Sequence, residues 1–135
     1  MSRASERDAI RSKIATVLSG ASISWDAFNG ETFTRTEGTA YYRPRIEDGS
    51  ADYVAIGGTT RRARSVATLI LEVYRPAGEG DDTGNAACDS IIAGFKDYQT
   101  AGISFMWRGR AIDAGSDAAW HKWLVLLPYY NEETV

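Results

Sequence analysis

The sequence predicts an α+β fold, in which a mostly antiparallel sheet of four to five strands carries two main helices packed on one face. Apolar residues recur with a helical period near the N-terminus and again after residue 80. Strand-like segments follow one another between and after these two regions. Consecutive strands with segregated helices are typical of α+β proteins. Because the chain has 135 residues, we expect residues 1–135 to form a single domain.

The first helix is predicted from Ile10, Ile14 and Leu18, which lie four residues apart and therefore share one helical face. Ser5 followed by Asp8 resembles a capping box, which predicts that the helix begins at Ser5.

The second helix is predicted just after residue 80, where Asp81 or Asp82 can cap its first turn and complement its dipole. Ala87, Ile91 and Phe95 form its apolar stripe.

Strand-like segments are found at residues 40–46, 66–74, 103–107 and 118–130. In the second segment, Leu69, Leu71 and Val73 alternate with a more polar set, which indicates a sheet with one covered face. Pro44 places the first segment at a sheet edge or at a strand's end.

Composition and charge narrow the classes of function. The formal net charge is -3, whereas domains built to bind nucleic acid usually carry a basic excess. The single cysteine, Cys88, rules out an internal disulfide. The N-terminus has no secretory signal, and no apolar run reaches the roughly 20 residues that span a bilayer. We therefore expect no membrane contact, and a reducing cytoplasm unless the protein leaves the cell within a particle.

The segment before the second strand has a different character. Residues 47–50, Glu-Asp-Gly-Ser, have the composition of a turn, and Arg61, Arg62 and Arg64 follow two glycines. We expect a mobile arm over about residues 47–64, ordered only when it meets a partner.

No residue pattern predicts catalysis, a metal site or a cofactor. His121 is the only histidine, so it has no second histidine with which to share a metal, and Cys88 lies on an apolar helical stripe. The alternative class is a small enzyme or ligand-binding α+β domain with a pocket near His121.

The aromatic content favours protein–protein contacts. The chain has four tryptophans and seven tyrosines, types that are enriched at interfaces. Trp120 and Trp123 have opposite strand parity, so we expect at least one tryptophan among Trp107, Trp120 and Trp123 to face solvent or a partner.

Several segments together resemble the tail terminator proteins of long-tailed bacteriophages, the group that includes lambda's minor tail protein U. The likeness lies in "AYYRPRI", "AIGGTTRRARSVATLILEVYRPAGEG", "AACDSIIAGF" and "AWHKWLVLLPYY". The resemblance implies a homohexameric ring at the head-proximal end of the tail tube of a phage or a phage-like particle such as a gene transfer agent. The ring would stop tube polymerisation and form the docking surface for the head connector.

The same resemblance implies the partners and the location. They are further copies of this chain, the tail tube protein and the head–tail connector, or stopper, protein, with DNA passing through the lumen without specific binding. The protein would assemble in the host cytoplasm and end in the virion tail. Another head–tail connector ring component is a second alternative.

In such a ring, a cationic arm can reach an acidic patch of the neighbouring subunit. The candidate interface residues are Arg61, Arg62 and Arg64 on one side and Glu79, Asp81 and Asp82 on the other. A rival hypothesis places the arginines in the lumen beside DNA phosphates. Because no heptad seam is present, we expect weak, concentration-dependent self-association of the free chain.

Overall fold

The structure is a computed structural model that describes residues 3–30, 32–34, 38–57, 60–78, 81–100, 102–117 and 119–134, with side chains at 3, 29, 50–57, 60–62, 81 and 133–134 not described. Its elements, in chain order, are α1 (Arg3–Val17), α2 (Asp26–Asn29), β1 (Tyr41–Gly57), β2 (Thr60–Pro76), α3 (Asp81–Phe95), β3 (Phe105–Met106), β4 (Arg110–Ser116) and β5 (Trp120–Thr134).

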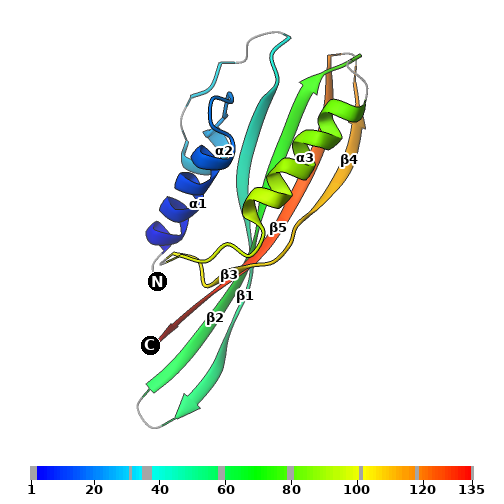
Figure 1. Ribbon diagram of the computed structural model, residues 1–135. Helices are drawn as coiled ribbons and strands as arrows, with labels where there is room; N and C mark the ends of the chain where they lie inside the picture. The colour runs from blue at the N-terminus through cyan, green and yellow to red at the C-terminus, as the bar shows by residue number, and fades with distance from the viewer. Residues whose placement is uncertain are drawn as a thin grey trace.

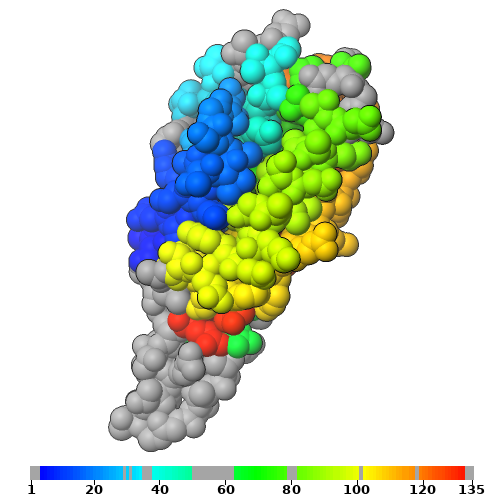
Figure 2. All heavy atoms as spheres, in the orientation of Figure 1, coloured from blue at the N-terminus to red at the C-terminus, as the bar shows by residue number. Residues whose placement is uncertain are grey.

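The predicted fold class is confirmed. The five strands form one antiparallel sheet with the order β1-β2-β5-β3, and β4 pairs with β5 on the same side as β3. Helices α1 and α3 lie side by side over one face of this sheet (Figure 1). In the space-filling view, their side chains cover that face, and the end of β5 emerges below them (Figure 2).

The core lies between the helices and the sheet. As the alternation predicts, Leu69, Leu71 and Val73 are buried beneath the helices. Ile10 and Ile14 of α1 are also buried, as the helical spacing predicts. Burial of such side chains stabilises a fold by roughly 1.5–3 kcal/mol each. The apolar pattern alone therefore determines which face of the sheet is covered.

A close approach between α3 and β5 requires a glycine. A Cβ placed on Gly84 would lie 2.1 Å from Cη2 of Trp123, which is 1% exposed. Gly84 costs helix stability relative to alanine, yet it lets the indole ring lie directly against the helix backbone.

The largest correction concerns residues 47–64, where the sequence predicts a turn and a mobile arm. Apart from residues 58–59, outside the described residues, this segment is strand: β1 and β2 pair from Tyr41↔Tyr74 to Gly57↔Thr60. Residues 47–50 hold a break in register between Asp48 and Ala51. A bulge absorbs the turn-like residues without ending the strand. The resulting hairpin extends well beyond the helices (Figure 1).

Smaller corrections concern element boundaries. Helix α1 begins at Arg3, so Ser5 lies inside the helix and the predicted capping box is wrong. The strand predicted at 103–107 is reduced to β3, and β4 lies between the segments predicted as strands at 103–107 and 118–130. Both short strands pair with the long β5, which compensates for their weak local signal.

Candidate interaction surface

Among the described residues, the two predicted groups lie in different elements, with the arginines in β2 and Asp81 and Asp82 at the start of α3. The side chains of Arg61, Arg62 and Asp81 and all of Glu79 lie outside the described residues. Asp82 is exposed near the start of α3, at the end of the molecule opposite the hairpin (Figure 1). A contact between these two groups would therefore join two chains, and it stays a prediction.

Arg64 has partners in its own chain. Its Nε donates to Oε1 of Glu132 at 2.8 Å, and a second guanidinium nitrogen donates to the same oxygen. The guanidinium carbon also lies 4.4 Å from the ring centroid of Tyr130. Arg64 therefore joins β2 to β5 at the base of the hairpin, and it is not a free arm residue.

The face of the sheet opposite the helices, here called the open sheet face, is formed by alternate residues of four strands. Its described members include Arg43, Arg45, Thr68, Ile70, Glu72, Tyr74, Arg110, Ile112, Lys122, Leu124, Leu126 and Pro128. Apolar residues of all three helices pack into the core on the other side, whereas Asp26 of α2 pairs with Arg43 of the open sheet face, with 3.1 Å between Oδ1 and Nε. This face is therefore the main surface left for a partner.

Glu72 is the centre of a charged cluster on the open sheet face. Its side chain is 3% exposed, and its carboxylate lies 2.7 Å from Nζ of Lys122 and 2.8 Å from Nη1 of Arg43. Nε of Arg45 lies 3.4 Å away, and the Tyr74 hydroxyl donates to the carboxylate at 2.8 Å. A buried carboxylate is tolerated when its oxygens are hydrogen-bonded in this way.

The contacts within the cluster favour the charged forms of Glu72 and Lys122. Burial by itself raises the pKa of Glu72, but hydrogen bonds from Lys122, Tyr74 and Arg43 outweigh burial, and the pKa is lowered. The hydrogen bond to Glu72 raises the pKa of Lys122. The carboxylate and the cations therefore remain charged at neutral pH, with more positive than negative charge on this face.

A groove crosses the open sheet face. One open cavity of about 300 Å³ is lined by Thr68, Arg108, Arg110, Leu126 and Pro128. A second, of about 210 Å³, shares Thr68 and Pro128 and reaches Trp107 and Glu47. We call the two together the sheet groove. It combines an apolar floor with arginine and aromatic side chains at its rim.

The tryptophan prediction is confirmed. Trp123 is 1% exposed in the core, whereas Trp107 is 42% exposed beside the sheet groove. The rings of Trp107 and Tyr130 lie 5.1 Å apart, and Phe105 lies 6.2 Å from Trp107. These three rings form an aromatic patch where β3 meets β5.

The two residues of the alternative class, His121 and Cys88, each have close neighbours within the fold. Nε2 of His121 lies 2.8 Å from Oδ1 of Asp113, and the imidazole stacks on Trp123 at 3.9 Å. Burial raises the pKa of Cys88 to about 11, helped by the charges of Asp89 and Asp113. A thiol with that pKa is not a nucleophile at neutral pH. Among the described residues, no group of three potential metal ligands occurs.

Comparison with known proteins supports the fold and gives no function. No protein-family model and no curated protein matches the sequence. Nineteen solved chains match in structure. One, whose name describes no activity, has a TM-score of 0.61 and 18% sequence identity over 94% of this chain and 95% of that chain. No described helix is long and apolar enough to cross a membrane.

Proposed function

We propose that this chain is a structural subunit of a phage or phage-like tail, a tail terminator that forms a homohexameric ring. The ring stops tube polymerisation, contacts the tail tube protein on one side and docks the head connector on the other. In this proposal the protein is not an enzyme, and DNA passes through the lumen without specific binding. It assembles in the host cytoplasm and remains in the virion tail.

The observation that carries this proposal is the projecting hairpin. The core includes β1 and β2 as far as Ile46 and Ala67, whereas their pairing continues to Gly57 and Thr60. Only β5 accompanies this outer part, as far as Arg62. A hairpin without a core behind it is marginally stable alone. In a ring, the neighbouring subunit supplies a surface against which such a hairpin can pack.

The charge of the chain agrees with a passive lumen. A net charge of -3 gives little attraction for phosphates, and Arg64 is already paired with Glu132. Arg61 and Arg62 remain candidates for a contact between the hairpin and the acidic residues at 79–82 of a neighbouring subunit.

The experiment that tests the proposal is deletion of the gene from cells that produce the particle. We expect tails longer than normal and unattached to heads, visible by negative-stain electron microscopy, with recovery when the gene is supplied from a plasmid. Particles of normal tail length with attached heads in the deletion strain would refute the proposal. The gene should also lie between those for the head connector and the tail tube.

A further inference from the structure

The cations near the open sheet face fall into two groups. Arg43, Arg45 and Lys122 share the carboxylate of Glu72. Arg108 and Arg110 are exposed, and within the described part of the chain neither has an ion pair or hydrogen bond. These two guanidinium groups are available to another molecule.

Their surroundings are suited to a protein partner. Both arginines border the sheet groove, whose floor includes Leu126 and Pro128, and the exposed Trp107 lies beside its other half. Arginine and tryptophan next to an apolar floor are the residue types that dominate binding energy at interfaces. The partner should supply carboxylates and allow close approach to a sheet.

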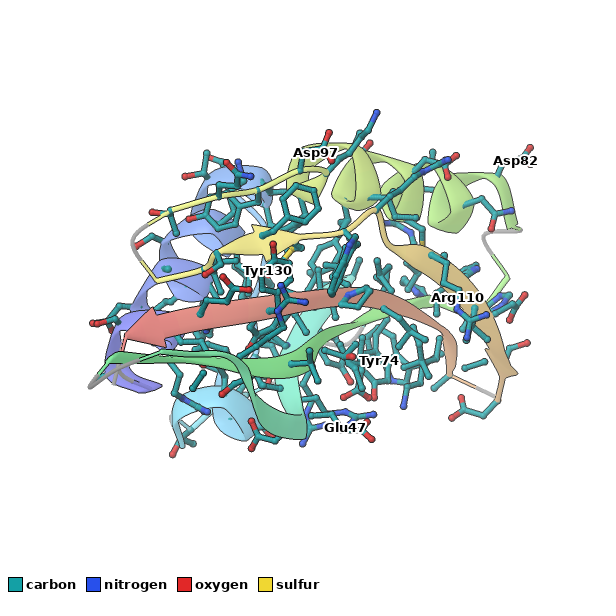
Figure 3. The ribbon with its side chains drawn as sticks, turned by 90° about the horizontal axis from the view of Figure 1, so that it is seen from below. Glu47, Tyr74, Asp82, Asp97, Arg110 and Tyr130 are labelled. Carbon is teal, nitrogen blue, oxygen red and sulfur yellow. The ribbon has the colours of Figure 1, made fainter. Side chains whose placement is uncertain are left out.

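The outward side of α3 has this chemistry. Asp82 and Asp89 are exposed, and neither has a hydrogen bond or ion pair among the described residues. Ala86 and Ala93 between and after them are also exposed, so no large side chain keeps a partner away. Asp82 near the start of α3 and Asp97 just after its end lie on the side of the molecule away from Glu47 (Figure 3).

We propose that the sheet groove of one copy binds the acidic outward side of α3 of a second copy, with Arg108 and Arg110 facing Asp82 and Asp89. The groove and α3 lie on opposite faces of the same sheet. One chain therefore cannot place its own α3 in its groove, although Arg108 also lines a cavity with Asp89 of the same chain. Two different surfaces that meet between copies form a head-to-tail interface, which closes into a ring when the rotation allows.

This inference deepens the proposed ring, because it names the contact between neighbouring subunits, and it rests on the proposed function only for the number of copies. It does not use the hairpin arginines. Arg108 also borders a cavity beside Asp89 of its own chain, whereas Arg110 lines the groove. Arg110 is therefore the residue to change.

The experiment measures self-association of the purified full chain by sedimentation velocity over a range of concentrations and at two salt concentrations. Arg110→Glu and Asp82→Lys should each weaken self-association by about tenfold or more, since a reversed charge replaces attraction by repulsion. An equimolar mixture of the two variants should recover association, because each reversed residue then meets its complement. Both positions are exposed, so circular dichroism should show unchanged folds.

Two matched controls separate the contact from net charge. Lys13→Glu lowers the formal net charge from -3 to -5, as Arg110→Glu does, but on α1. Asp8→Lys raises it to -1, as Asp82→Lys does, but on α1. We expect neither control to weaken association.

Four results would overturn the inference: no self-association of the native chain, equal weakening by the controls, no recovery in the mixture, or weakening by Arg61→Glu and Arg62→Glu but not by Arg110→Glu. The proposed function is judged separately by tail length. Recovery in the mixture, combined with normal tails in the deletion strain, would keep this interface and remove the tail assignment.

Discussion

Arg64 and Glu132 face each other directly across β2 and β5, and Nε of Arg64 lies 2.8 Å from Oε1 of Glu132. The two residues are 68 positions apart in the sequence. Their pair lies close to the point where β5 ends beside the hairpin, since β5 pairs with β2 only as far as Arg62. It links the projecting part of the molecule to the last strand.

The first prediction concerns this pair. Arg64 is 41% exposed and Glu132 is 15% exposed at the side chain, so solvent weakens their attraction. In a double-mutant cycle with Arg64→Ala and Glu132→Ala, we expect a coupling free energy of about 0.5–1 kcal/mol. Urea unfolding measures it. The pair Arg45–Glu47, at 4.0 Å and with Glu47 70% exposed, is the control, with coupling near zero. Equal coupling in both cycles would contradict the assigned role.

The second prediction concerns Glu72. Glu72→Ala should destabilise the fold by about 2 kcal/mol, because Lys122, Arg43 and Arg45 then repel one another beside an emptied site. These cations are 32–38% exposed, which limits the cost. Glu47→Ala, at a side chain that is 70% exposed, should change the free energy of unfolding by less than about 0.5 kcal/mol. A smaller loss for Glu72→Ala than for Glu47→Ala would show that the cluster does not stabilise the fold.

The third prediction follows from the lowered pKa of Glu72. Because the folded-state pKa lies below the ordinary value of 4.5, the unfolded chain takes up this proton first as the pH falls. The contribution of ionised Glu72 to the free energy of unfolding is complete above pH 4.5 and is lost as the pH falls through the folded-state pKa. Between pH 7 and pH 3.5, the native protein should therefore lose more unfolding free energy than Glu72→Gln does. Parallel pH profiles for the two proteins would exclude Glu72 as the titrating group.

How far the sequence predicts the fold depends on the range of the interactions involved. The period of Ile10 and Ile14 and the alternation of Leu69, Leu71 and Val73 are local patterns, and they correctly predict the covered face. The long β1 was missed at residues 47–50, because a bulge can contain turn-like residues when a partner strand continues.

The candidate surface was less predictable than the fold. The sequence places Glu72 on the more polar side of its strand, but it cannot show that Lys122 and Arg43 converge on it, because that depends on the register of three strands. The same limit explains why the sequence predicts a free arm at Arg64, since its partner Glu132 lies in the last strand. Charge pairs that depend on strand register can be identified only when the pairing of the strands is known.

The fourth prediction concerns the contact of α3 with β5. Alanine is the better helix former, so Gly84→Ala would stabilise an isolated helix by about 1 kcal/mol. In this fold the new Cβ would meet the Trp123 ring at 2.1 Å, and the overlap forces the helix or the ring to move. We expect a net loss of about 1–3 kcal/mol in urea unfolding, with reduced near-ultraviolet tryptophan dichroism. Asn85→Ala, exposed on the same helix, should be neutral or slightly stabilising. Stabilisation by Gly84→Ala would show that the close contact is absent.

The last prediction separates a structural cysteine from a reactive one. Cys88 is 1% exposed, and burial, with the charges of Asp89 and Asp113, raises the pKa of its thiol to about 11. At pH 8 only about one thiol in a thousand is then ionised, against about a quarter for a free cysteine with its ordinary pKa. Since the thiolate is the reacting species, iodoacetamide should label the native protein at least about 100-fold more slowly than the urea-unfolded chain, as measured by mass spectrometry over time. The rate should increase as the native protein is opened by added urea. Labelling of the native protein faster than the unfolded chain would show an activated thiol, and it would favour the enzyme alternative.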